Sequence, residues 1–204
     1  MAVTEKRILR FPVYKRERSG LMCKILKELQ GKTAQDLLNI YRISDEPPID
    51  VDALLSNIGM SIVPIDFSPI EDEVKIPQGS ILGATIAGGE NLSVFYRVDA
   101  TENRKRFTLA HEIAHCCLHT ESLIDHHIEF RENQKALNGK EYEANIFAGE
   151  LLIPERSLHK IYNRLLVPSL ASLMKIFKVS APVMIERLKY LDLQYLVDVE
   201  MEEV

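Results

Sequence analysis

The chain has 204 residues, of which 46% are hydrophobic and 27% charged, and its formal net charge is −5. This composition is typical of a globular protein with one substantial core, and the acidic balance argues against general affinity for nucleic acid. No apolar run reaches the roughly 20 residues that span a bilayer, and the charged N-terminus lacks the apolar segment of a signal peptide, so we expect a cytoplasmic protein. Cys23, Cys116 and Cys117 lack the spacing of a disulfide framework and are predicted to be reduced and buried.

Residues 1–46 are predicted to form a basic, helical N-terminal segment. Nine Lys and Arg residues precede residue 33, against three Glu. Such an excess of bases usually marks a solvated terminus, although it can also contact acidic partners or phosphates. A helix is expected between Gly20 and Gly31, and the tandem prolines of Asp45–Pro48 end the segment because proline cannot continue a helix.

Residues 47–154 are predicted to form an α+β core. Asp50 is placed to cap a helix that ends at Gly59. Strands are expected over 60–65, 81–86 and 92–98, the last two joined as a hairpin. Together they predict a small mixed or antiparallel sheet packed on the helix that follows. If one strand forms an open edge, an extended peptide can add to it as an extra strand.

Two flanking segments complete the predicted core. Residues 67–79, with three acids and two prolines, read as a loop at the rim of a cleft. Residues 100–120 contain neither Pro nor Gly and place apolar side chains around most of a helix. Asp99 with Glu102 predicts a capping box at its start, and Thr101 is an alternative cap.

The run His111-Glu-Ile-Ala-His115 in this helix points to metal chemistry. Two histidines four residues apart lie on one helix face and can bind one zinc ion, while Glu112 can reach a water on that ion. The pattern therefore predicts hydrolysis, with the carboxylate as general base. The alternative is two buried histidines bonded to backbone carbonyls. We favour the metal because a glutamate in an apolar stretch is costly without a charged partner.

A third zinc ligand is expected in the predicted helix of residues 141–152. Glu141 and Asn145 lie one turn apart, so both can face the cleft, Glu141 as ligand and Asn145 as a group that orients a ligand. Glu143 is the alternative metal ligand. It lies about 200° around the helix from Glu141, so only one of the two can face the metal. We favour Glu141 as the ligand because a polar residue, Asn145, follows it one helical turn later.

These paired motifs resemble a known family. Phe107-Thr-Leu-Ala-His-Glu-Ile-Ala-His115, followed by Glu141-Tyr-Glu-Ala-Asn-Ile-Phe-Ala-Gly-Glu-Leu-Leu-Ile-Pro154, is similar to the ImmA/IrrE family of bacterial zinc metallopeptidases. The resemblance implies a zincin-like, gluzincin-type core, Zn²⁺ held by the two histidines and Glu141, and Glu112 as general base. It further implies a cytoplasmic endopeptidase that cleaves helix-turn-helix repressors of phage, mobile-element, toxin–antitoxin or stress regulons.

Residues 155–204 are predicted to form a C-terminal helical module. Helices are expected over 155–165, 170–177 and about 182–191, with Ser180 as cap of the last, in an order that resembles a helix-turn-helix unit. The exposed positions of the last helix are predicted to be Glu186, Arg187 and Lys189. This mixed set of charges is unlike a basic stripe, so we expect a packing or docking module rather than direct DNA binding.

Three functional hypotheses follow from the sequence. The favoured one is a protease that cuts a helix-turn-helix repressor, because a protein that only binds has no need of Glu112. The second is a regulator that binds a repressor or antitoxin without cutting it. The third is a DNA-binding protein that uses the C-terminal helices. For the protease, a further electrophile is expected to stabilise the oxyanion, with Tyr142, Tyr96 and Arg97 as candidates.

Overall fold

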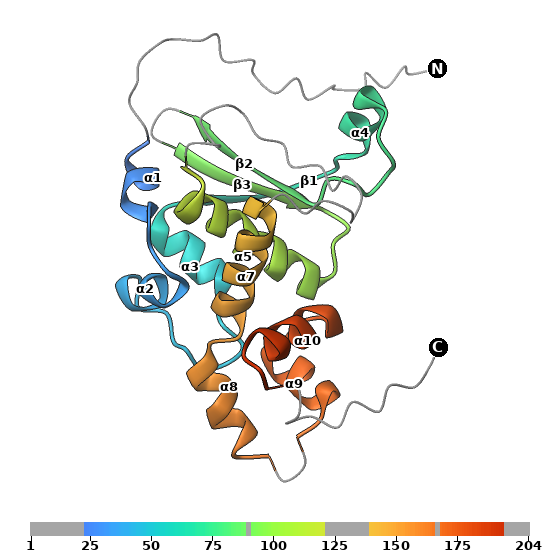
Figure 1. The fold of residues 1–204 in the computed structure, drawn as a ribbon. Helices are drawn as coiled ribbons and strands as arrows, with labels where there is room; N and C mark the ends of the chain where they lie inside the picture. Colours follow the sequence, from blue (N-terminus) through green and yellow to red (C-terminus); the bar gives the residue numbers. More distant parts are fainter. Residues whose placement is uncertain (1–22, 89–90, 121–138, 166–167, 194–204) are drawn as a thin grey trace.

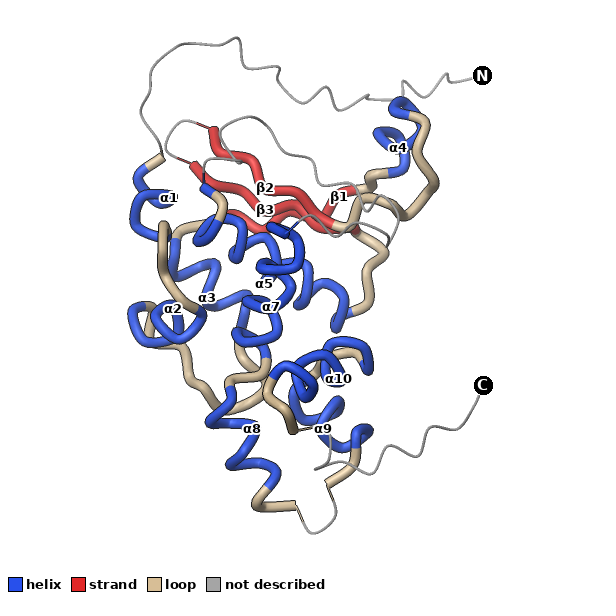
Figure 2. Tube along the Cα trace, in the orientation of Figure 1, coloured by secondary structure: helices blue, strands red, loops and turns tan. Residues whose placement is uncertain are grey.

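The computed structural model describes residues 23–88, 91–120, 139–165 and 168–193. These residues form an α+β fold in which a small sheet lies on one side and most of the helices lie beneath it, as Figures 1 and 2 show. The α+β class predicted from the sequence is confirmed. No helix within the described ranges is long and apolar enough to cross a membrane.

The described sheet has three strands in the order β1-β3-β2. β1 (Ser61–Ile65) runs parallel to β3 (Asn91–Arg97), and β2 (Gly83–Gly88) pairs antiparallel with β3 in the predicted hairpin. The strand predictions are therefore confirmed to within two residues at each end. β2 forms one edge of this sheet, and this is the edge beside the motif helix.

Two central helices lie side by side under the sheet, α5 (Glu102–Leu118) and α7 (Gly139–Leu152) (Figure 1). The capping box predicted from Asp99 is wrong. Thr101 is the cap, and its side chain accepts a hydrogen bond from the Arg104 backbone N–H. Asp99 instead binds Arg97, whose Nε lies 3.1 Å from the Asp99 carboxylate, because a charged partner competes with the helix end.

The helix before β1 begins and ends at the residues predicted from the sequence. In α3 (Val51–Ile58) the Asp50 carboxylate accepts from the Ala53 N–H at 2.9 Å, and Gly59 closes the helix with φ +90°. The loop predicted over 67–79 is partly wrong, because residues Ser68–Val74 form α4. Proline fits the first turn of a helix, and the acidic run contains a buried residue, Glu71, that has partners inside the protein.

Two short helices precede α3. α1 (Lys24–Leu29) lies within the helix predicted between Gly20 and Gly31, whereas the basic residues before position 23 lie outside the described ranges. α2 (Ala34–Ile40) was not predicted. Its signal is a capping box in which Thr33 and Asp36 each accept from the other's backbone N–H.

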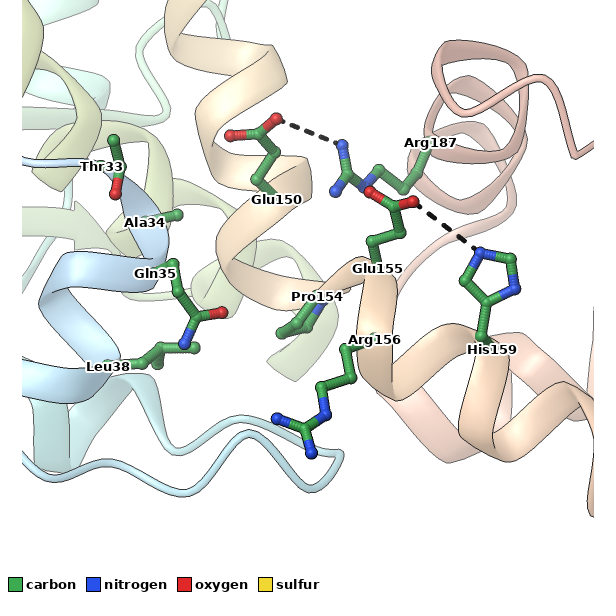
Figure 3. Close-up of a pocket in the computed structure, with 10 residues that line it drawn as sticks. All are labelled: Thr33, Ala34, Gln35, Leu38, Glu150, Pro154, Glu155, Arg156, His159 and Arg187. Carbon is green, nitrogen blue, oxygen red and sulfur yellow. Dashed lines mark hydrogen bonds and ion pairs between the residues drawn. The ribbon is translucent and has the colours of Figure 1, made fainter.

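The C-terminal helices form as predicted, namely α8 (Glu155–Tyr162), α9 (Leu170–Phe177) and α10 (Ala181–Tyr190). Ser180 is at the predicted N-cap position of α10, but its side chain makes no capping hydrogen bond. The predicted exposure of Arg187 is wrong. Its Nε donates to the Ile153 carbonyl at 3.1 Å and its Nη1 lies 3.4 Å from Glu150, as Figure 3 shows for the second pair.

One cluster of buried apolar side chains includes residues from all three predicted segments, among them Leu37, Ile113 and Phe177. Arg106 of α5 adds polar links between distant parts of the chain, because its guanidinium donates to the carbonyl oxygens of Ile49 and Lys178. The helices of the N-terminal and C-terminal segments are therefore packed on the same core that carries α5 and α7.

Candidate metal centre and active site

Three potential metal ligands converge where α5 meets α7. The Nε2 atoms of His111 and His115 lie 3.0 Å apart. Glu141 places one carboxylate oxygen 3.2 Å from His111 Nε2 and the other 3.6 Å from His115 Nε2. One ligand atom from each residue lies within 4.8 Å of the other two, so a single cation can be shared by all three. We refer to His111, His115 and Glu141 as the metal cluster.

Helix geometry explains this convergence. His111 and His115 are four residues apart on α5 and therefore project from the same face, one turn from each other. Glu141 lies in the first turn of α7, the helix that packs beside α5. A motif with two ligands on one helix thus receives its third from the neighbouring helix.

Contacts to the Nδ1 atoms of His111 and His115 orient both rings so that their Nε2 atoms face the metal cluster. Asn145, one turn after Glu141, places Oδ1 at 3.0 Å from His111 Nδ1. An amide oxygen only accepts, so His111 carries its proton on Nδ1 and keeps the lone pair of Nε2 for the cluster. Asn145 therefore lies where the sequence predicted a ligand-orienting group.

His115 is oriented by a residue that the sequence analysis did not identify. His115 Nδ1 lies 3.1 Å from His119 Nδ1, and His119 Nε2 lies 2.8 Å from Glu143 Oε2. Since Glu143 accepts from His119 Nε2–H, His119 Nδ1 is left to accept from His115 Nδ1–H. This leaves the lone pair of His115 Nε2 directed at the cluster, as metal binding requires.

Glu143 and His119 thus form a pair outside the metal cluster. Glu143, the alternative ligand of the sequence analysis, lies on the far side of His119 from the cluster atoms. The signal for His119 was present in the sequence, because it follows His115 by four residues and continues the same helix face.

Glu112 is buried between α5 and the sheet. The Thr85 hydroxyl of β2 donates to Glu112 Oε2 at 2.6 Å. Gly83, two residues earlier on the same strand, allows this close approach. A Cβ atom there would lie 2.4 Å from the Thr108 methyl carbon and 2.9 Å from Glu112 Oε1. The candidate general base is therefore fixed in position by the edge strand above it.

Comparison with protein families agrees with this geometry. The family model described as the IrrE N-terminal-like domain, a peptidase family, matches residues 74–189, which is more than half of the chain. The chain belongs to this family. A search of the curated proteins finds no match. Membership supports peptidase activity of the ImmA/IrrE type and implies a metal ion, with which the two imidazoles and the carboxylate of the metal cluster are compatible.

The three cysteines of the chain are buried in its core. Cys23, Cys116 and Cys117 are free and buried. Burial raises the pKa of the Cys116 thiol well above its ordinary value and that of Cys117 to about 12. Among the described residues, the donor atoms that converge belong to His111, His115 and Glu141, so neither cysteine is part of the metal cluster.

A buried ion pair fixes the start of the edge strand. Glu71 of α4 is fully buried and accepts from the Ile81 N–H at 2.7 Å, the Gly79 N–H at 3.0 Å and Arg97 Nη1 at 2.9 Å. Burial raises the pKa of Glu71, but these backbone bonds and the arginine outweigh burial and hold it below its usual value. The network immobilises the segment that leads into Gly83.

One of the three residues considered as stabilisers of the oxyanion, Arg97, is part of this network. The Arg97 guanidinium is occupied by Glu71 and Asp99, and the Tyr96 ring lies under Lys105, whose Nζ is 5.5 Å from the ring centroid. Tyr142 is 55% exposed and stands on α7, one residue after Glu141. Of the three, Tyr142 is the one that is exposed and directly follows a metal cluster residue in the chain.

Proposed function

We propose that this IrrE-like domain is a zinc-dependent endopeptidase. The observation that carries the proposal is the convergence of His111, His115 and Glu141 next to a buried glutamate, Glu112, held by Thr85. The metal cluster supplies three donors and leaves a tetrahedral ion one position for water or substrate. A bound zinc ion would lower the pKa of that water and polarise the carbonyl of the scissile peptide bond.

Glu112 is proposed to act as the general base and then as the acid. Its carboxylate takes the proton of the attacking water and returns it to the nitrogen of the leaving amine. The hydrogen bond from Thr85 to Oε2 holds this carboxylate in position. His119 and Glu143 keep His115 in the tautomer that binds metal, and Asn145 does the same for His111.

β2 is proposed to bind the backbone of the substrate. It is an edge strand of the described sheet and carries Thr85, the partner of Glu112, so a peptide added along it would pass beside the base. Backbone hydrogen bonds along an edge hold any extended sequence. Selectivity then requires side-chain pockets near the scissile bond.

The proposed substrate is a helix-turn-helix repressor, as the family resemblance implies. The burial of Arg187 weakens the DNA-binding alternative, because its guanidinium is bonded inside the protein, and the exposed Lys189 lies 2.9 Å from an acid, Glu186, that repels phosphate. The C-terminal helices are therefore proposed to take part in substrate recognition rather than in contacts with DNA.

Incubation of the zinc-loaded protein with purified helix-turn-helix repressors from the same genome tests this proposal. We expect one or a few discrete cuts by mass spectrometry, none with Glu112→Gln, and equal zinc content in both proteins. Glu102→Gln, on the exposed first turn of α5, is the matched control and should cut normally. Equal de-repression in cells by Glu112→Gln and wild type would favour the non-cleaving regulator and reject the protease.

A further inference from the structure

A hollow of about 540 Å³ lies between α5, α7 and α10. Apolar side chains form much of its wall, namely Leu82, Phe107, Ile146, Pro182 and Val183. The α10 residues in its lining extend from Pro182 in the first turn to Tyr190 at the end of the helix, so the hollow follows the whole length of α10. Apolar surface of this extent gains free energy when it is covered.

The charges around the hollow favour an acidic partner. The N-cap residues of α5 and α10, Thr101 and Ser180, both line it, and the N-terminal end of a helix carries partial positive charge. Arg104 is exposed in the lining, and no carboxylate within the described ranges forms an ion pair with it. The acid in the lining, Glu186, is compensated by Lys189 at 2.9 Å. The hollow therefore suits a partner that carries both apolar and acidic side chains.

Residues 194–204 of this chain have both properties. Their sequence is Gln-Tyr-Leu-Val-Asp-Val-Glu-Met-Glu-Glu-Val, in which 4 of 11 residues are acidic and none is basic. Val197, Val199 and Met201 occupy alternate positions, with an acid after each of them. Because alternate side chains of an extended chain point to opposite sides, this segment in an extended conformation would be apolar on one side and acidic on the other.

The segment begins close to the hollow and is long enough to follow it. Tyr190 lines the hollow, and Leu193 comes three residues later. Asp192 has φ +55° and the Leu193 N–H donates to the Leu188 carbonyl at 2.7 Å, a turn that redirects the chain at the end of α10. Eleven extended residues span up to about 36 Å, whereas α10 is about 15 Å long. Residues 194–204 can therefore run back along the whole helix.

The hollow shown in Figure 3 is a poorer match for this segment. It has about 400 Å³ and is lined by parts of α2, α7 and α8. Two acids line it, Glu150 beside Arg187 and Glu155 beside His159. Its apolar lining is limited to Ala34, Leu38 and Pro154. An acidic segment would meet like charges there and bury less apolar surface.

We propose that residues 194–204 fold back along α10 and dock in the hollow between α5, α7 and α10, with Val197, Val199 and Met201 on its apolar wall. The acids of the segment then lie toward Arg104 and the N-terminal ends of α5 and α10. The C-terminal segment thus covers an apolar surface that these three helices leave open. The inference is independent of the proposed peptidase activity.

A tryptophan placed in the hollow tests the inference, because the chain has no tryptophan of its own. Tyr190→Trp in the full chain supplies this reporter, and quenching of its fluorescence by acrylamide measures its exposure. Because only molecules with an undocked segment expose the reporter, quenching should be at least about twofold weaker than in the same protein carrying Val197→Asp, Val199→Asp and Met201→Asp. Ile40→Trp, on α2, is the matched control, since Ile40 and Tyr190 are both 52% exposed, and should be quenched equally with either segment.

Two further variants separate apolar packing from charge. Val197→Leu with Val199→Leu keeps the apolar side of the segment and should keep the reporter shielded. Arg104→Gln should lower the equilibrium constant for docking about two- to fivefold, because an exposed charge pair is screened by water. Equal quenching of the reporter with the wild-type and the aspartate-substituted segment would overturn the inference. Shielding that disappears on dilution would also overturn it, because the cover would then come from a second copy of the chain.

Discussion

The hydroxyl of Thr85 and the carboxylate of Glu112, 27 residues apart in the chain, are joined by a hydrogen bond of 2.6 Å. This bond connects the edge strand of the sheet to the helix that carries both histidines of the metal cluster. The strand proposed to hold the substrate therefore also holds the proposed base. A change in β2 is expected to alter substrate binding and the position of Glu112 together.

Replacement of Thr85 by Val keeps the shape of the side chain and removes the donor. We expect kcat to fall about ten- to a hundredfold, because a hydrogen bond to a charged group contributes about 1.5–3 kcal/mol. Zinc affinity, measured by chelator competition, should not change, since Thr85 contacts none of the cluster atoms. Thr85→Ser retains the donor and should keep most of the activity; a tenfold loss in this control would point to packing instead.

Gly83→Ala tests the close approach of β2 to α5. The added methyl group would meet the Thr108 side chain and the Phe95 carbonyl, the latter at 3.1 Å, so the strand must move away from the helix. We expect a loss of about 1–3 kcal/mol in the free energy of unfolding and a fall in activity as the Thr85 bond lengthens. Gly139→Ala, where a Cβ meets nothing within 4 Å, should leave both quantities unchanged in urea titrations and peptidase assays.

The variants Glu141→Gln and Glu143→Gln distinguish the proposed metal ligand, Glu141, from Glu143, which is proposed to act by orienting His119. Loss of the Glu141 carboxylate should abolish stoichiometric zinc binding. Loss of the Glu143 carboxylate weakens the orientation of His119 and hence of His115, so zinc affinity should fall about ten- to a hundredfold but binding should persist. Calorimetry with zinc checks both, and the reverse ranking would assign the ligand role to Glu143.

The buried pair of Glu71 and Arg97 predicts a specific acid sensitivity. Because the pKa of Glu71 is lowered in the folded protein, its contribution to stability is complete above the ordinary value of 4.5 and is lost as the pH falls through the folded-state pKa. Glu71→Gln should cost about 3 kcal/mol at pH 7, since it removes the buried carboxylate from Arg97 and leaves this guanidinium only the exposed Asp99 as a charged partner. Urea titrations at pH 7 and near pH 3 should show a smaller loss in the variant than in wild type.

The thiols of Cys116 and Cys117 should resist alkylation. Both are buried and their pKa values are raised, so the reactive thiolate is scarce at pH 8. Mass spectrometry after treatment with iodoacetamide should find both residues unmodified in native protein and modified in 6 M guanidinium. Rapid labelling of either one in zinc-free native protein would contradict the buried placement.

Local patterns in the sequence determined the elements that depend on near neighbours. The spacing of His111 and His115 set one helix face, Asp50 and Gly59 set the ends of α3, and the β2–β3 hairpin followed from two β-rich runs around glycines. These features could be predicted because helix and hairpin geometry relates residues a few positions apart. The choice of Thr101 over Asp99 as cap could not, because it depended on a partner, Arg97.

Only the tertiary structure decided how distant residues meet. It placed Glu143 on His119 rather than on the metal cluster, Thr85 on Glu112, and Arg187 in the interior instead of on an exposed recognition face. Each of these outcomes depends on which side of one element faces another, and periodicity within a single helix or strand carries no information about that. The sequence by itself therefore determined which side chains are available for metal chemistry, whereas packing decided which residues orient the two histidines and which one holds Glu112.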